Sequence, residues 1–216
     1  MKLSDNTLNI LKNFAGINNS ILVKQGTQLR TISVAKNILA EAQIGEEFPR
    51  DFAIYDLNQF LNGLGLHQDP EMDFSPDSYL SIREGKRRVK YFYADPNVII
   101  SPPDKEITLP SEDVKFRLES GVLQQLQRAA SVYQLPDLCL FSDGETMQLC
   151  VTDKKNDTSN SYMVDVGTAT EQFCYCFKVE NLKLLMGSYN VSLSKKNVAL
   201  FQGEGIKYYI ALEPNT

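Results

Sequence analysis

Four cysteines come closest to forming a chemical site in this chain. Cys174 and Cys176 alternate along one expected strand and therefore share a face of it. Cys139 and Cys150 lie on two other expected strands, so a metal cluster is conceivable, but the paired CxxC spacing of zinc knuckles is missing. Buried, reduced thiols fit better, because no secretory signal accompanies them. We therefore expect neither a metal ion nor a cofactor.

Residues typical of catalysis are sparse. His67 is the single histidine and falls in a turn-like stretch, where a surface loop residue is a better interpretation than a general base. No Walker loop or Rossmann glycine motif is present. Asp69, Glu71 and Asp73 form an acidic cluster whose spacing matches no calcium loop, so we interpret it as a solvated face. These observations predict a protein that is not an enzyme.

The strongest concentration of positive charge is the stretch REGKRRVK at residues 83–90, with five of the 22 lysine and arginine residues. It is compatible with a nucleic-acid patch, a solvated hairpin, or an edge strand whose charges select a partner strand. The last two interpretations carry equal weight, above the first. The net charge of −5 argues against a uniformly basic nucleic-acid binder, but not against one with its positive charge gathered on one face.

The helices and strands that position these residues include a unit that occurs twice in the chain. Residues 52–65 (FAIYDLNQFLNGLG) read as a short strand, an N-cap at Asp56 and an amphipathic helix ended by glycine. The unit returns as FKVENLKLLMG at residues 177–187, with Glu180 in the place of Asp56. Both halves also read as a helix followed by several short strands. The sequence therefore predicts an α+β fold of two duplicated domains, each with two helices packed on antiparallel sheet.

The expected boundaries are residues 1–93 for the first domain, 94–110 for a connector and 111–216 for the second domain. The connector holds four of the nine prolines, which remove backbone donors and favour an extended chain. It also contains the apolar run Val98, Ile99 and Ile100, for which we favour packing onto its own domain. No apolar run is long enough to span a bilayer, so we expect an intracellular protein without membrane contact.

The polar faces of the four expected helices, residues 4–15, 57–64, 120–133 and 180–186, are poor in acids. Asparagine and glutamine separate their few cations, which are Lys2, Lys12, Arg128 and Lys183. Such faces suit loose contacts with phosphates that do not depend on base sequence. Four ordinary surface helices are the alternative interpretation.

The chain resembles the sliding clamps of T-even-type bacteriophages, which are DNA polymerase processivity factors and share their fold with proliferating cell nuclear antigen. The resemblance runs through motifs in order along nearly the whole chain: MKLS at residues 1–4, ILKNFA at 10–15, AIYDLN at 53–58, ADP at 94–96, LQQL at 123–126, FQGE at 201–204 and IALE at 210–213. It implies the DNA-clamp fold, with two clamp domains per chain.

The resemblance also implies a function. Three chains would form a closed ring that encircles duplex DNA without sequence specificity and tethers the replicative DNA polymerase. An ATP-driven clamp loader would place the homotrimer on DNA, in the cytoplasm of the infected bacterial host. The alternative is a protein-interaction scaffold that forms no ring and does not encircle DNA.

Three sets of residues follow from combining this resemblance with the patterns above. The residues expected to face DNA are Lys2, Lys12, Arg128 and Lys183. A pocket for the C-terminal peptide of the polymerase is expected at Val98, Ile99, Ile100, Tyr209, Leu212 and Pro214. The subunit interface is expected where a basic strand meets an acidic strand of the next subunit, at Arg87, Arg88, Lys90 and Asp165.

Overall fold

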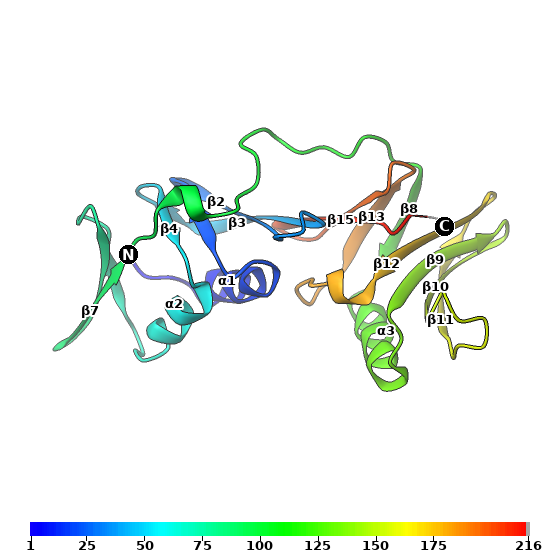
Figure 1. Cartoon of the computed structure of the whole chain (residues 1–216), viewed down its shortest axis with the longest axis horizontal. Coiled ribbons are helices and arrows are strands. Elements are labelled where there is room, and N and C mark those ends of the chain that lie inside the picture. Colours follow the sequence, from blue (N-terminus) through cyan, green and yellow to red (C-terminus); the bar gives the residue numbers. More distant parts are fainter. Residues whose placement is uncertain (215–216) are drawn as a thin grey trace. The chain divides into compact units, whose positions relative to one another are not determined.

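The computed structural model describes residues 1–214, which form two compact units (Figure 1). The first unit is Met1–Lys105 and the second begins at Glu106. Each unit combines helix with antiparallel strands, so the expected α+β class is confirmed. Between residues 93 and 113 the chain contains no strand, only one short 3-10 helix, η1 (Pro96–Val98).

The first unit contains two α-helices and seven strands. In chain order these are α1 (Asp5–Ile17), β1 (Ile21–Val23), β2 (Gly26–Ile32), β3 (Ile38–Phe48), β4 (Phe52–Ile54), α2 (Leu57–Leu64), β5 (Glu71–Asp73), β6 (Tyr79–Glu84) and β7 (Arg87–Phe92). The antiparallel pairs are β1 with β4 and β2 with β3, and a three-stranded sheet has the order β5-β6-β7. Strand β7 is therefore an edge strand.

Both helices of the first unit begin at side-chain caps and bury one apolar face. The N–H of Thr7 donates to Ser4 Oγ at 3.3 Å, and the N–H of Gln59 donates to Asp56 Oδ1 at 2.8 Å. These bonds satisfy N–H groups that have no partner inside the helix. The side chains of Thr7, Ile10, Leu11 and Phe14 form the buried stripe of α1, while Lys12 on the opposite face is exposed.

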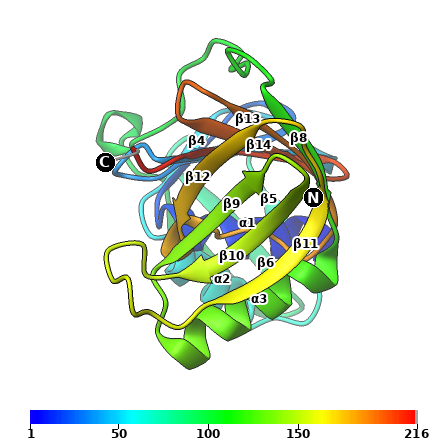
Figure 2. The ribbon, with the colours of Figure 1, turned by 90° about the vertical axis from the view of Figure 1, so that its right-hand side faces the viewer.

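The second unit contains one α-helix and eight strands. In chain order these are β8 (Val114–Leu118), α3 (Ser120–Tyr133), β9 (Asp137–Asp143), β10 (Thr146–Thr152), β11 (Tyr162–Thr168), β12 (Gln172–Lys178), the 3-10 helix η2 (Val179–Asn181), β13 (Tyr189–Ser194), β14 (Val198–Gln202) and β15 (Ile206–Ala211). Figure 2 faces the sheet β11-β10-β9-β12, against which α3 packs. Strands β8, β13, β14 and β15 pair in the order β15-β14-β13-β8. None of the helices in residues 1–214 has the length and apolarity that a membrane crossing requires.

The prediction of a helix at residues 180–186 is wrong. Only the single turn η2 forms there, and residues 182–185 follow it without regular structure. Glu180 lies inside that turn and does not cap it, whereas Asp56 caps α2. The second domain therefore has one α-helix in place of the two that the repeat suggested.

Side chains from other elements take over the hydrogen bonds that a helix would make at residues 182–185. The hydroxyl of Tyr208 accepts from the N–H of Leu185 at 3.1 Å, and the hydroxyl of Tyr189 donates to the carbonyl of Leu185 at 2.6 Å. The side chain of Gln127 donates to the carbonyl of Leu182 at 2.9 Å. Satisfied backbone groups remove the penalty for leaving the helical conformation.

The two tyrosines belong to the core of the second unit. The rings of Tyr189 and Tyr208 meet edge to face with centroids 6.1 Å apart, and Tyr189 contacts Phe201 in the same way. Burial raises the pKa of Tyr189 to about 12 and raises the pKa of Tyr208 further. Both hydroxyls are therefore protonated at neutral pH.

Replacement of Tyr208 by Phe tests this arrangement. We expect the free energy of unfolding to fall by about 1–3 kcal/mol, because the N–H of Leu185 loses its acceptor. Tyr209→Phe is a matched control, because its hydroxyl donates at 2.7 Å to the carbonyl of Ile107 and not to residues 182–185. Urea unfolding of both variants measures the difference, and equal losses would contradict the assigned role.

Candidate functional site

The exposed faces of the α-helices carry almost no negative charge. Among residues 1–214, the three α-helices contain one of the chain's 27 acidic residues, Asp5 at the start of α1. Lys12 on α1 and Arg128 on α3 are exposed. Asparagine and glutamine side chains, such as Asn58, occupy most of the remaining polar positions. These faces can approach a polyanion with little electrostatic repulsion.

The other two cations that the sequence assigned to helix faces lie outside the helices. Lys2 precedes α1 and is exposed, and its ion pair with Asp69 raises the pKa of Lys2. Lys183 is exposed in the irregular segment after η2, because the expected helix does not form. Lys2 and Lys12 line one cavity of about 180 Å³ in the first unit. The structure therefore brings these two cations together.

His67 lines the same cavity; it lies in a loop as expected, but the prediction that its side chain is at the surface is wrong. Its side chain is only 3% exposed, with Nδ1 at 3.4 Å from Glu84 Oε2. The Glu84 carboxylate also accepts from the N–H groups of Asp69 and Gln68, and these bonds hold the pKa of Glu84 below its usual value. Glu84 thus holds residues 67–69 close to its own strand, and its carboxylate lies against the imidazole of His67. No local sequence pattern signals this long-range contact.

Strand β7 has the features of a pairing edge. The side chains of Arg87, Arg88 and Lys90 are exposed, and Phe92 at its end is also exposed. Arg87 contacts Glu84 of the same hairpin at 3.5 Å. The basic run is therefore a solvated hairpin whose outer strand lies at the edge of its sheet.

Strand β11 is the edge of the four-stranded sheet in the second unit. Asp165 is exposed and accepts from the side chain of Gln148 at 2.5 Å. Tyr162 and Met163 at the start of the strand are also exposed. The strand contains an acid and no base, so its charge is opposite to that of β7.

The apolar run of the connector divides between core and surface. Ile99 is 7% exposed, whereas Val98 and Ile100 are 58% and 39% exposed. Two side chains hold the connector against the first unit: Asn18 donates to the carbonyl of Ile100 at 3.1 Å, and Arg30 donates to the carbonyl of Pro103 at 2.8 Å. The expectation that the whole run packs inward is therefore correct only for Ile99.

The C-terminal members of the expected pocket differ in exposure. Tyr209 and Leu212 are buried, and Pro214 is exposed. The N–H of Glu213 donates to the carbonyl of Cys176 at 2.7 Å, which joins Glu213 to β12. Of these three residues, only Pro214 is exposed to solvent.

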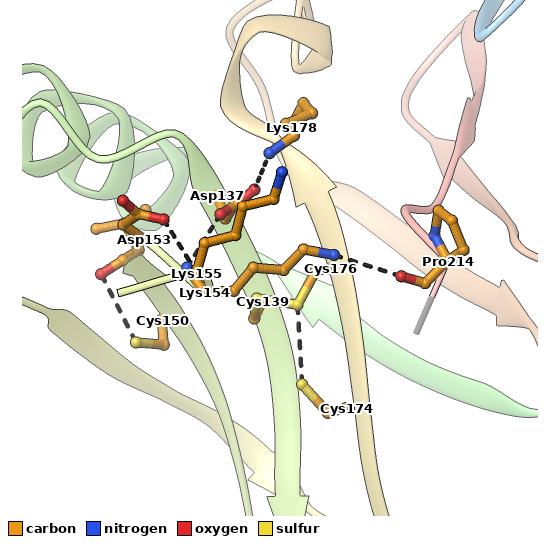
Figure 3. The surroundings of a disulfide bond; sticks show 11 residues. Asp137, Cys139, Cys150, Asp153, Lys154, Lys155, Cys174, Cys176, Lys178 and Pro214 are labelled. Atoms are coloured by element: carbon orange, nitrogen blue, oxygen red, sulfur yellow. Dashed lines mark hydrogen bonds and ion pairs between the residues drawn. A yellow bond between two sulfur atoms is a disulfide. The ribbon is translucent and has the colours of Figure 1, made fainter. Parts of the chain in front are cut away.

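The cysteines depart from the sequence prediction of four reduced thiols. Cys139 and Cys176 form a disulfide (Figure 3). They face each other across β9 and β12, with Cα atoms 4.0 Å apart. Cys150 and Cys174 are free. Strand register, which spacing along the chain does not reveal, brings the two disulfide partners together.

Two family models match the chain in succession. The model described as DNA polymerase processivity factor matches residues 3–101, and the model described as gp45 sliding clamp, C terminal, matches residues 115–214. The fold resembles a solved structure of the C-terminal region of FEN-1 bound to A. fulgidus PCNA, with a TM-score of 0.71 and 14% identity. That likeness covers 100% of both chains.

Curated relatives match over the full length. The sliding clamp of Vibrio phage KVP40 is 32% identical over an alignment of 220 positions, which covers 99% of each chain. The sliding clamp of Enterobacteria phage T4 is 31% identical over 225 residues, covering 100% of this chain and 98% of the relative. With both family models matched in order, the chain belongs to the sliding clamps of T4-like bacteriophages, which are DNA polymerase processivity factors.

Proposed function

We propose that three copies of this chain form a closed ring around duplex DNA and tether the replicative DNA polymerase, without catalysing a reaction. The acid-poor helix faces carry this proposal, because an acidic protein must keep its negative charge away from phosphates to surround them. Membership in the sliding-clamp family favours this function over a scaffold that never encircles DNA. An ATP-driven loader would open the ring in the cytoplasm of the infected host.

The expected DNA contact is weak and independent of base sequence. Lys2, Lys12, Arg128 and Lys183 are exposed cations, and neutral amides surround those on the helices. Contacts of this type attract the phosphate backbone and do not read base edges. Tight binding is not needed, since a closed ring leaves a circular duplex only by opening. A weak contact also leaves the ring free to slide.

Replacing all four cations by Ala tests the DNA-facing assignment. We expect slower loading, and a salt dependence of direct DNA binding that is flatter by about 0.9 in log–log slope for each lost phosphate contact. A matched control replaces four exposed lysines in strand turns, which are Lys36, Lys86, Lys195 and Lys196. Loading onto nicked circular DNA and filter binding at several salt concentrations measure the effect. Equal behaviour of the two variants would remove the assignment.

Ring closure is proposed to use the two edge strands. An edge strand has unpaired backbone groups along one side, and these can extend a neighbouring sheet. Strand β7 offers Arg88 and Lys90, whereas β11 offers Asp165, so charge favours pairing β7 of one copy with β11 of the next. Phe92 and Met163 add exposed apolar surface to the two strands. Because β7 and β11 differ, the contact is head to tail, as a cyclic trimer requires.

Reversing the charge of Arg88 and Lys90 with Glu tests this contact. We expect each subunit contact to weaken by about 1 kcal/mol and monomers to appear, more strongly at low salt, where screening is least. Adding Asp165→Lys to the same chain should restore part of the trimer. Light scattering against protein concentration measures the mass. An unchanged trimer in the double variant would overturn the pairing.

Partner docking is proposed at the connector. Val98 and Ile100 expose apolar side chains, while the bonds from Asn18 and Arg30 hold the backbone in place. A held segment loses little entropy on binding, and an apolar anchor of the polymerase's C-terminal peptide would bury these side chains. The related structure that contains the C-terminal region of FEN-1 supports this kind of partner. A contribution from Tyr209, Leu212 and Pro214 stays a prediction from the sequence.

Val98→Ser together with Ile100→Ser tests the docking surface. We expect peptide binding to weaken at least about tenfold, because several methyl and methylene groups lose their burial, while the melting temperature changes little. Ile99→Ser is the matched control and should lower the melting temperature, because it buries a hydroxyl group in the core. Fluorescence anisotropy of the labelled peptide measures affinity. Unimpaired binding to the double variant would exclude this surface.

A further inference from the structure

Three sulfur atoms of the second unit lie unusually close together. The Sγ atoms of Cys139, Cys174 and Cys176 all fall within 4.8 Å of one another, and those of Cys174 and Cys176 are 3.8 Å apart (Figure 3). Cys139 lies opposite Cys176 in the strand pairing, and Cys174 is two residues away on β12. The three side chains therefore share one face of the sheet. The clamp function uses none of them.

The spacing matches the coordination of a soft metal ion. Zinc–sulfur bonds are about 2.3 Å long, so two thiolates on a tetrahedral zinc ion lie about 3.8 Å apart. The Cys174–Cys176 sulfur distance equals this value, and the Cys139–Cys174 pair lies within 4.8 Å, whereas the disulfide holds the sulfurs of Cys139 and Cys176 at bonding distance. Reduction of the disulfide frees the sulfurs of Cys139 and Cys176, which must then rotate apart to about 3.8 Å. The register of β9 and β12 thus brings three possible zinc ligands together, although their spacing along the chain lacks the CxxC pattern of zinc sites.

We propose that Cys139, Cys174 and Cys176 bind one zinc ion when the disulfide is reduced. A thiol or phosphine reductant supplies two electrons, and two protons complete the thiols of Cys139 and Cys176. Zinc then displaces one proton from each of the three thiols. Water takes the fourth position, since Cys174 is exposed to solvent. Disulfide and metal-bound cluster are alternative states, because they use the same two sulfur atoms.

The surroundings suit a site with net negative charge. Three thiolates on a divalent ion carry one negative charge, and Lys154 approaches the cluster with its ammonium bonded to the carbonyl of Pro214 at 3.4 Å. Metal binding supplies the additional stabilisation that a thiolate needs in such a place.

Cys150 provides an internal comparison. It is buried on β10 opposite Cys139, but its sulfur contacts the carbonyl of Val151 at 3.6 Å and lies outside the three-sulfur cluster. We therefore assign it no ligand role. It is the chain's one cysteine outside the cluster and a natural control for nonspecific thiol binding.

The test titrates the full, reduced chain with Zn²⁺ against a chromogenic chelator, and with Co²⁺ as a spectroscopic probe. We expect one ion per chain and a thiolate-to-cobalt charge-transfer band. Cys174→Ser should weaken zinc binding more than about tenfold and reduce that band, since ligand loss costs at least as much as loss of an outer-shell partner. Its exposed position makes misfolding a poor explanation for that loss, and a thermal melt checks it.

Two comparisons complete the test. Cys150→Ala should retain one ion per chain with unchanged affinity, and the oxidised chain, with its disulfide intact, should bind none. Absence of binding by the reduced chain, equal binding by Cys174→Ser, or loss of binding in Cys150→Ala would each overturn the three-ligand site. None of these measurements requires ring formation or DNA, so failure of the metal site leaves the proposed clamp function untouched.

Discussion

Antiparallel strand pairing is the constraint on which the rest of this structure depends. Each ladder places alternate side chains on opposite faces, so one face can bury apolar groups while the other meets water. Pairing also leaves an unpaired outer strand wherever a sheet ends, and in each unit one such strand, β7 or β11, carries exposed charge of one sign. The same register sets Cys139 opposite Cys176. The buried core, the exposed edge strands and the cysteine cluster therefore all result from the hydrogen-bond pattern of antiparallel pairing.

For the approach of DNA, the positions of the charged residues matter more than the net charge of the chain. The chain has a net charge of −5, yet its α-helices contain one acidic residue among residues 1–214. Individual exposed ion pairs, such as Lys2 with Asp69, contribute little to stability, because water and salt screen the two charges. Their larger effect is on the field around the molecule, which attracts or repels a polyanion. A clamp that surrounds DNA needs its acidic residues kept away from the helix faces. The fold itself does not depend on this separation of charge.

The two halves provide a hydrogen-bond donor to equivalent leucine carbonyls in different ways. In α2 the carbonyl of Leu61 accepts the backbone N–H of Gly65, four residues later. In the second unit the carbonyl of Leu185 accepts the hydroxyl of Tyr189, also four residues later. The leucine carbonyl has a hydrogen-bond donor in both cases. In the second unit the donor is the hydroxyl of Tyr189, so the segment packs against the aromatic core and does not form a helix. Internal similarity therefore predicts the position of a segment better than its conformation.

Much of the fold follows from the sequence alone, because it rests on local chemistry. The buried stripe of α1, the Asp56 cap of α2 and the α+β class depend on spacing and on side chains within a few residues of each other. The full-length motifs likewise led to the sliding-clamp family. Only the tertiary structure decided the inward turn of His67, the exposure of Val98 and the disulfide of Cys139. Each of these is set by groups distant in the chain, and their meeting depends on strand register and packing that no local pattern encodes.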